Sequence, residues 1–125
     1  MTTIDTDTDR GYLIDAFLGA RTILSEPGAW CQQNLALHRE HRGEYGVDPL
    51  NPEADTFCLV GAIKAATGQP VTKHPAVEYL RDLLRRRLDY KGTPQWWNDI
   101  EGRTQAEVVG LLDTAIEELK NEPSP

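Results

Sequence analysis

Apolar residues recur at steps of three and four along most of the chain, the spacing typical of amphipathic helices. The first such stretch begins at about Asp9. It ends in "SEPG", where Pro27 breaks the backbone hydrogen-bond ladder and Gly28 permits a turn. Later in the chain, residues 75–90 and 104–121 repeat the same spacing. We therefore predict a helix in each of these three segments.

A fourth segment, residues 51–68, is apolar around most of its circumference, which is typical of a helix buried on all sides. Asn51 suits the N-cap, Pro52 suits the first helical position, and Gly68 suits the residue that ends a helix. We predict one central core helix over this segment. Within it, Gly61 would let a neighbouring element approach closely.

Between the first and the central helix the pattern is weaker. Residues 31–40 could form a short fifth helix, and the glycine, proline, asparagine and aspartate residues that follow predict an irregular loop. No stretch shows the sustained alternation of polar and apolar positions that indicates a strand. The predicted fold class is therefore all-α, a compact bundle of four to five helices with one long ordered loop.

A chain of 125 residues fits one domain of ordinary size. Its first residues, "MTTIDTDTDR", are polar and rich in threonine and aspartate. We expect a flexible N-terminal arm over residues 1–8, a single helical domain over residues 9–121 and a flexible tail over residues 122–125.

The formal net charge is −7, which repels phosphate backbones and disfavours nucleic-acid binding. A local basic cluster, Arg81 and residues 85–87, lies beside Asp82 and other carboxylates at helical spacing. We interpret it as a paired, solvated helix face. No signal peptide and no membrane-spanning run is recognisable, so we expect a cytoplasmic protein with reduced thiols and no membrane contact.

Two of the three tryptophans stand side by side in "TPQWWNDIEGRT", just before the last helix. We expect Trp96 and Trp97 to lie outside a helix, and Asn98 and Asp99 to act as turn residues. Together with Trp30, these residues could wall a cleft for a planar ligand or a peptide, or form a protein-binding hot spot. The alternative, which the residue types favour, is a structural lid over one end of the bundle.

Cys58 is a second candidate, because a thiol near a helix N-terminus can be activated as a nucleophile, with a base from His38, His41 or His74. If the helix begins at Pro52, however, Cys58 lies near its second turn, where the effect of the dipole fades. It then resembles a small buried hydrophobic residue. We therefore assign no catalytic residue and keep Cys58 as an alternative reactive thiol.

Cys31, His38 and His41 are residue types that bind metals, but they lack the paired spacing of CxxC or HExxH motifs. We predict no metal site and no cofactor. A Cys31–Cys58 disulfide is disfavoured by the reducing compartment that we expect.

Three blocks, "ILSEPGAWCQ", "DTFCLVGAIKAAT" and "WWNDIEGRTQAEVVGLLDTAI", carry the motifs PGAW, CLxGA and WND. In this combination the chain resembles a family of small uncharacterised proteins from actinobacteria, other bacteria and their phages. The resemblance covers most of the chain. It implies a short helical domain without an established activity, and a phage or mobile-element origin.

These observations favour a non-catalytic protein-interaction or accessory factor. A more specific form of this hypothesis is that a phage or mobile element encodes the protein. The expected partner is a protein, and the expected binding residues are Trp30, Trp96, Trp97, Asn98 and Asp99. The alternative is a small-ligand-binding or enzymatic domain with a site around Cys58 and residues 96–99.

Overall fold

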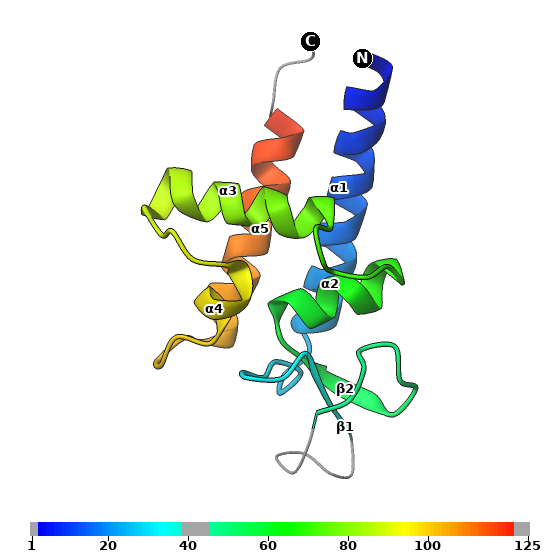
Figure 1. Ribbon diagram of the computed structural model, residues 1–125, viewed down its shortest axis with the longest axis vertical. Coiled ribbons are helices and arrows are strands. Elements are labelled where there is room, and N and C mark those ends of the chain that lie inside the picture. The colour runs from blue at the N-terminus through cyan, green and yellow to red at the C-terminus, as the bar shows by residue number, and fades with distance from the viewer. Residues whose placement is uncertain (1–2, 39–45, 122–125) are drawn as a thin grey trace.

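The computed structural model describes residues 3–38 and 46–121, and within them the chain forms five helices and two strands (Figure 1). In chain order the elements are α1 (Thr3–Leu24), β1 (Ala36–His38), β2 (Ala54–Phe57), α2 (Leu59–Thr67), α3 (Pro75–Leu88), α4 (Pro94–Asn98) and α5 (Gln105–Asn121). The predicted all-α class is therefore wrong in one respect. The fold is mostly helical, but it includes a small two-stranded antiparallel sheet.

The helices pack around one hydrophobic core. α1 lies against both α2 and α5, α3 crosses over α5, and the two strands lie at the end of the molecule remote from the start of α1 (Figure 1). The core is built from the apolar stripes of these helices, because burial of such side chains is the main force that holds helices together. Its largest fully buried side chains are Phe17, Leu24, Leu59, Ile63, Leu80, Leu83, Leu84, Leu112 and Leu119.

The predicted core helix over residues 51–68 is wrong in its first half. β2 occupies Ala54–Phe57, and α2 begins only at Leu59. Asn51 forms the local contact that its type indicates, because its side chain accepts a hydrogen bond from the backbone N–H of Glu53 at 2.8 Å. The same contact serves an Asx turn and a helix N-cap. The local signal therefore did not distinguish a helix from a turn that leads into a strand.

The strand forms because an earlier segment supplies its backbone partners. Phe57 donates its N–H to the oxygen of Ala29 at 2.7 Å, and its own oxygen accepts the N–H of Cys31 at 3.0 Å. β1 then pairs with β2 in the register Ala36–Phe57, Leu37–Thr56 and His38–Ala54. The predicted short helix over residues 31–40 is therefore wrong where the structure describes it, and β1 stands in its place.

Several local signals are confirmed. The N–H of Thr104 donates to Oε1 of Glu107 at 2.9 Å, and the N–H of Glu107 donates to Oγ1 of Thr104 at 3.1 Å, which is a complete capping box. Gly68 ends α2 in the left-handed conformation, with φ of 70°. A Cβ on Gly61 would lie 1.8 Å from the backbone oxygen of Leu35, so the close approach expected there is confirmed.

The helix α1 begins at Thr3, earlier than the predicted start near Asp9, so it takes in residues that we expected to precede it. The division into arm, domain and tail stays a prediction, and residues 1–2 and 122–125 lie outside the described residues. Among the residues described, no helix combines the length and the apolar character that crossing a lipid bilayer requires.

Candidate functional site

Asn98, the last residue of α4, is fully buried at the centre of a hydrogen-bond network. Its Oδ1 accepts the indole N–H of Trp30 at 2.7 Å and the backbone N–H of Leu59 at 3.0 Å. Its Nδ2 donates to the backbone oxygen of Cys31 at 3.1 Å and to Oδ1 of Asp99 at 3.0 Å. A side-chain amide has two donor and two acceptor positions. The chain itself occupies all four, so this amide offers nothing to a ligand.

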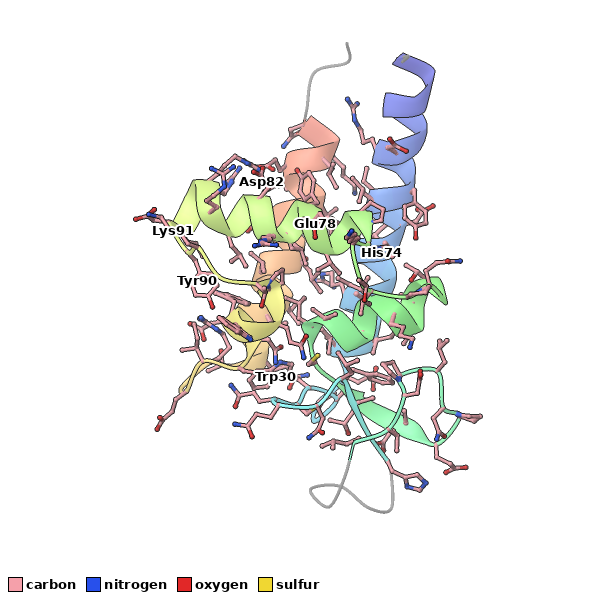
Figure 2. The ribbon with its side chains drawn as sticks, viewed as in Figure 1. Trp30, His74, Glu78, Asp82, Tyr90 and Lys91 are labelled. Carbon is pink, nitrogen blue, oxygen red and sulfur yellow. The ribbon has the colours of Figure 1, made fainter. Side chains whose placement is uncertain are left out.

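These five residues, which we call the Asn98 network, join the loop after α1, the start of α2 and the end of α4. Two further contacts reinforce it: Gln32 donates its Nε2 to the backbone oxygen of Asn98 at 3.0 Å, and the N–H of Gln33 donates to Oδ1 of Asp99 at 2.8 Å. Figure 2 shows Trp30 beneath α4. The structure thus brings together three of the candidate binding residues, because Trp30 and Asp99 both hydrogen-bond to Asn98. These bonds connect segments of the chain that are distant in sequence.

Trp96 and Trp97 lie inside α4, so the prediction that both stand outside a helix is wrong. The signal we missed is the Thr93-Pro94 pair: Oγ1 of Thr93 accepts the N–H of Trp96 at 3.1 Å as an N-cap, and Pro94 opens the helix. Adjacent helical positions point about 100° apart. Trp97 is accordingly 5% exposed and packs into the core beneath the guanidinium of Arg103, whereas Trp96 is 69% exposed.

Cys58 is the N-cap residue of α2 and not a residue of its second turn, because α2 begins at Leu59. Its Sγ accepts the N–H of Gly61 at 3.3 Å. A helix N-terminus favours a thiolate, but the side chain of Cys58 is only 1% exposed, and burial raises its pKa to about 11. Burial also raises the pKa of Cys31, to about 12. Both thiols are therefore protonated at neutral pH, and neither is an activated nucleophile.

Within its described residues, the structure does not place the histidines that we considered as a catalytic base in hydrogen-bond contact with Cys58. His74 caps α3 with its Nδ1, which accepts the N–H of Ala76 at 3.0 Å, and its Nε2 lies 2.8 Å from the hydroxyl of Tyr12. Because Nδ1 is an acceptor, the neutral ring carries its proton on Nε2. Burial also lowers the pKa of His74, which keeps the ring neutral. His38 lies in β1, and His41 lies outside the described residues.

The metal-ligand types gather nowhere in the part of the chain that the structure describes. No group of three His, Cys, Asp or Glu side chains there is placed to hold a metal ion.

Ion pairs on the described part of α3 hold Arg85, Arg86 and Arg87, three of the four arginines of the predicted cluster, and they form partly as the spacing indicated. Asp82 contacts Arg85 and Arg86, each at 2.5 Å. Arg86 and Arg87 also reach Glu118 on α5, each at 2.8 Å, a partner that helical spacing could not reveal. Hydrogen bonds from these arginines, first from Arg86, lower the pKa of Glu118 to about 2. Figure 2 shows Asp82 on the outer side of α3, consistent with a solvated face.

Comparison with known proteins places this chain in a family. Residues 12–118 match a family of unknown function, DUF6197. The chain belongs to DUF6197. No curated protein matches the chain, and no solved structure matches it.

Membership of DUF6197 agrees with the resemblance to a family without an established activity. The match does not show that the three motifs define the family, and it does not show an actinobacterial or phage origin. Its range includes the Asn98 network, Cys58 and the paired face of α3, so each of these features lies in the DUF6197 part of the chain.

Proposed function

We propose that this DUF6197 protein is a non-catalytic interaction protein that binds a partner protein through Trp96. The observation that carries the proposal is the position of the indole, which is 69% exposed on the outer face of α4. Large aromatic side chains dominate the energetics of protein interfaces. Ile100, which follows α4 and is 40% exposed, adds apolar area to the same segment.

The contacts of α4 support this role because they fix the backbone from which the Trp96 side chain projects. Thr93 caps the helix, Trp97 is buried against the core, and Asn98 is tied to two other parts of the chain. An anchor that is already ordered loses little conformational entropy when it binds. In this proposal the Asn98 network positions the binding residue without contacting the partner itself.

The more specific form of the proposal is an accessory factor of a phage or mobile element that works in the cytoplasm. Cys31 and Cys58 are free thiols, the state that a reducing compartment maintains. The motif resemblance supports the phage or mobile-element setting. The net charge of −7 favours a protein over a nucleic acid as the partner.

The state of Cys58 argues against the enzymatic alternative. A catalytic thiol must be accessible and must ionise readily, whereas Cys58 is buried and its pKa is raised. We expect the native protein to resist iodoacetamide and to be labelled only after denaturation, as followed by mass spectrometry. Rapid labelling of Cys58 in the native state would revive the enzyme hypothesis.

The first test is acrylamide quenching of tryptophan fluorescence in the wild type, Trp96→Phe and Trp97→Phe. We expect Trp96→Phe to remove a red-shifted, readily quenched component, because only this indole faces solvent in α4. Trp97→Phe should leave that component in place. If Trp96→Phe does not change the quenching, Trp96 is covered and the proposal fails.

The second test asks what Trp96 contacts. A photo-crosslinking amino acid is placed at position 96, or at the exposed Glu101 as the matched control, in the cell that produces the protein. We expect one discrete protein adduct from position 96 and none from position 101. The purified partner should bind Trp96→Ala roughly tenfold or more weakly than wild type, with unchanged protein stability. Equal affinity for both would reject the proposal.

A further inference from the structure

A groove of about 610 Å³ lies between the C-terminal half of α3, α4 and the first half of α5. Its base is apolar, because Leu83, Trp97 and Leu111 line it and are buried. Leu88 also lines it and is 57% exposed, so it forms an apolar rim. This volume lies within the range of small-molecule sites, roughly 300–1,000 Å³, which are mostly apolar with a few placed polar groups.

One wall of the groove lacks a side chain. Gly110 lines it from within α5, and a Cβ added there would meet no atom within 4 Å. Internal packing explains two other helical glycines. A Cβ on Gly19 would lie 2.8 Å from the Cβ of Ala66, and a Cβ on Gly61 would lie 1.8 Å from the backbone oxygen of Leu35. No such contact explains Gly110, although glycine weakens a helix by about 0.5–1 kcal/mol relative to alanine.

The polar groups of the groove include two arginines held in place. Nε of Arg103 donates to the backbone oxygen of Trp97 at 3.0 Å, and its guanidinium lies 3.9 Å from the centre of the Trp97 ring. Its Nη1 is 3.6 Å from Glu107. On the opposite side, Arg87 uses Nε and Nη2 to bond Glu118 at 2.9 and 2.8 Å.

The charge balance of the lining therefore differs from that of the whole chain. Arg87 and Arg103 outnumber the single carboxylate of Glu107 among the lining residues, although the chain as a whole carries −7 and Arg87 is paired with Glu118 outside the lining. Nη2 of Arg103 and Nη1 of Arg87 take no part in the contacts just described. Each guanidinium therefore has one remaining Nη group, and each such group can donate one charge-assisted hydrogen bond to a carboxylate oxygen.

From these observations we propose that the groove binds a small apolar carboxylate. Its apolar body lies against Leu88 and beside Gly110, above the buried base, and its carboxylate accepts hydrogen bonds from Arg103 and Arg87. The site is separate from the exposed indole of Trp96, so it does not depend on the proposed interaction function. A ligand without a charge would leave the arginines without a new partner, and a small inorganic anion would leave the exposed Leu88 in contact with water.

The test uses 8-anilinonaphthalene-1-sulfonate as a fluorescent reporter, displaced by 2-naphthoate or by its uncharged analogue 2-naphthamide. We expect 2-naphthoate to displace the reporter at a concentration roughly tenfold or more below that of the amide, because charge-assisted hydrogen bonds form only with the carboxylate. Arg103→Gln should remove this preference, so that the carboxylate and the amide displace the reporter at similar concentrations. Arg87→Gln tests the same point if Arg103→Gln does not fold.

Gly110→Leu adds a side chain at the groove, where a Cβ meets no atom within 4 Å, and Gly11→Leu is its matched control. Gly11 is also a helical glycine whose Cβ would meet no atom within 4 Å, but it lies in α1. We expect Gly110→Leu to weaken 2-naphthoate binding roughly tenfold or more, and Gly11→Leu to bind as wild type does, with both variants melting cooperatively by circular dichroism.

Three results would overturn the proposal. The first is equal displacement by the carboxylate and the amide, and the second is equal binding by the Gly110→Leu and Gly11→Leu variants. The third is a wild type that sediments as a dimer while Gly110→Leu sediments as a monomer, since the groove would then hold a second copy of the chain.

Discussion

The Asn98 network and the groove beside α5 share the short helix α4, but they differ in how fully their polar groups are hydrogen-bonded within the chain. In the network, every hydrogen-bonding position of the Asn98 amide is used within the chain. In the groove, Arg103 is fixed at the edge of an open apolar surface that Gly110 leaves unfilled. A buried cluster whose hydrogen-bonding positions are all used supports structure, whereas the arginines of the proposed carboxylate site keep one Nη group each for a ligand.

The largest effect on stability is expected from Asn98→Ala, which removes the amide at the centre of the fully hydrogen-bonded Asn98 network. It leaves the indole N–H of Trp30 and the backbone N–H of Leu59 without their acceptor in a buried place. We expect a loss of roughly 3–5 kcal/mol in the free energy of unfolding, measured by urea denaturation.

The control for this change is Asn121→Ala, at an exposed position near the end of α5. It should change the free energy of unfolding by less than about 0.5 kcal/mol. A loss below about 1 kcal/mol for Asn98→Ala would contradict the idea that this amide holds α4 in place.

A smaller effect on stability is expected at two glycines, Gly61 in α2 and Gly110 in the wall of the groove. A Cβ at Gly61 would press on the oxygen of Leu35, so we expect Gly61→Ala to lower the free energy of unfolding by about 2–3 kcal/mol. Gly110→Ala meets open space and should raise it by about 0.5–1 kcal/mol, since alanine is the better helix former.

Urea denaturation of both variants measures the sign directly. Opposite signs would confirm that one glycine is required by internal packing and the other is not. If Gly110→Ala destabilised the protein, α5 would be packed at that point and the groove would not be open there.

The smallest effect concerns Glu118, whose pKa is lowered from 4.5 to about 2 by hydrogen bonds from Arg86, Tyr79 and Arg87. Because the folded pKa lies below the ordinary value, this stabilisation is present above about pH 4.5 and is lost as the pH falls from 4.5 towards 2. We expect a contribution of about 1–2 kcal/mol, reduced by the exposure of the arginines.

The measurement is the free energy of unfolding between pH 7 and pH 2.5 for the wild type and for Glu118→Gln. Asp82 titrates in the same direction, because its pKa is also lowered by Arg86 and Arg85. Because Arg86 contacts both carboxylates, the difference between the two proteins measures Glu118 together with its coupling to Asp82 through Arg86. Parallel pH profiles would show that its contacts with α3 do not stabilise the fold.

The sequence by itself determined the features whose partners lie within a few residues. The capping box of Thr104 and Glu107 and the pairing of Asp82 with Arg85 and Arg86 are both present as the spacing indicated. The geometry of a helical turn sets such contacts, so residue type and spacing are sufficient to predict them.

Only the tertiary structure decided the features whose partners are distant in sequence. Asn51 makes a local contact compatible with a helix, but the backbone of residues 29–38 pairs with β2 and so moves the start of α2 to Leu59. Trp30 lies 68 positions from its acceptor on Asn98, a distance that no periodic pattern covers. Because short polar motifs serve turns and helix caps equally, long-range pairing chose between them and built both the network and the groove.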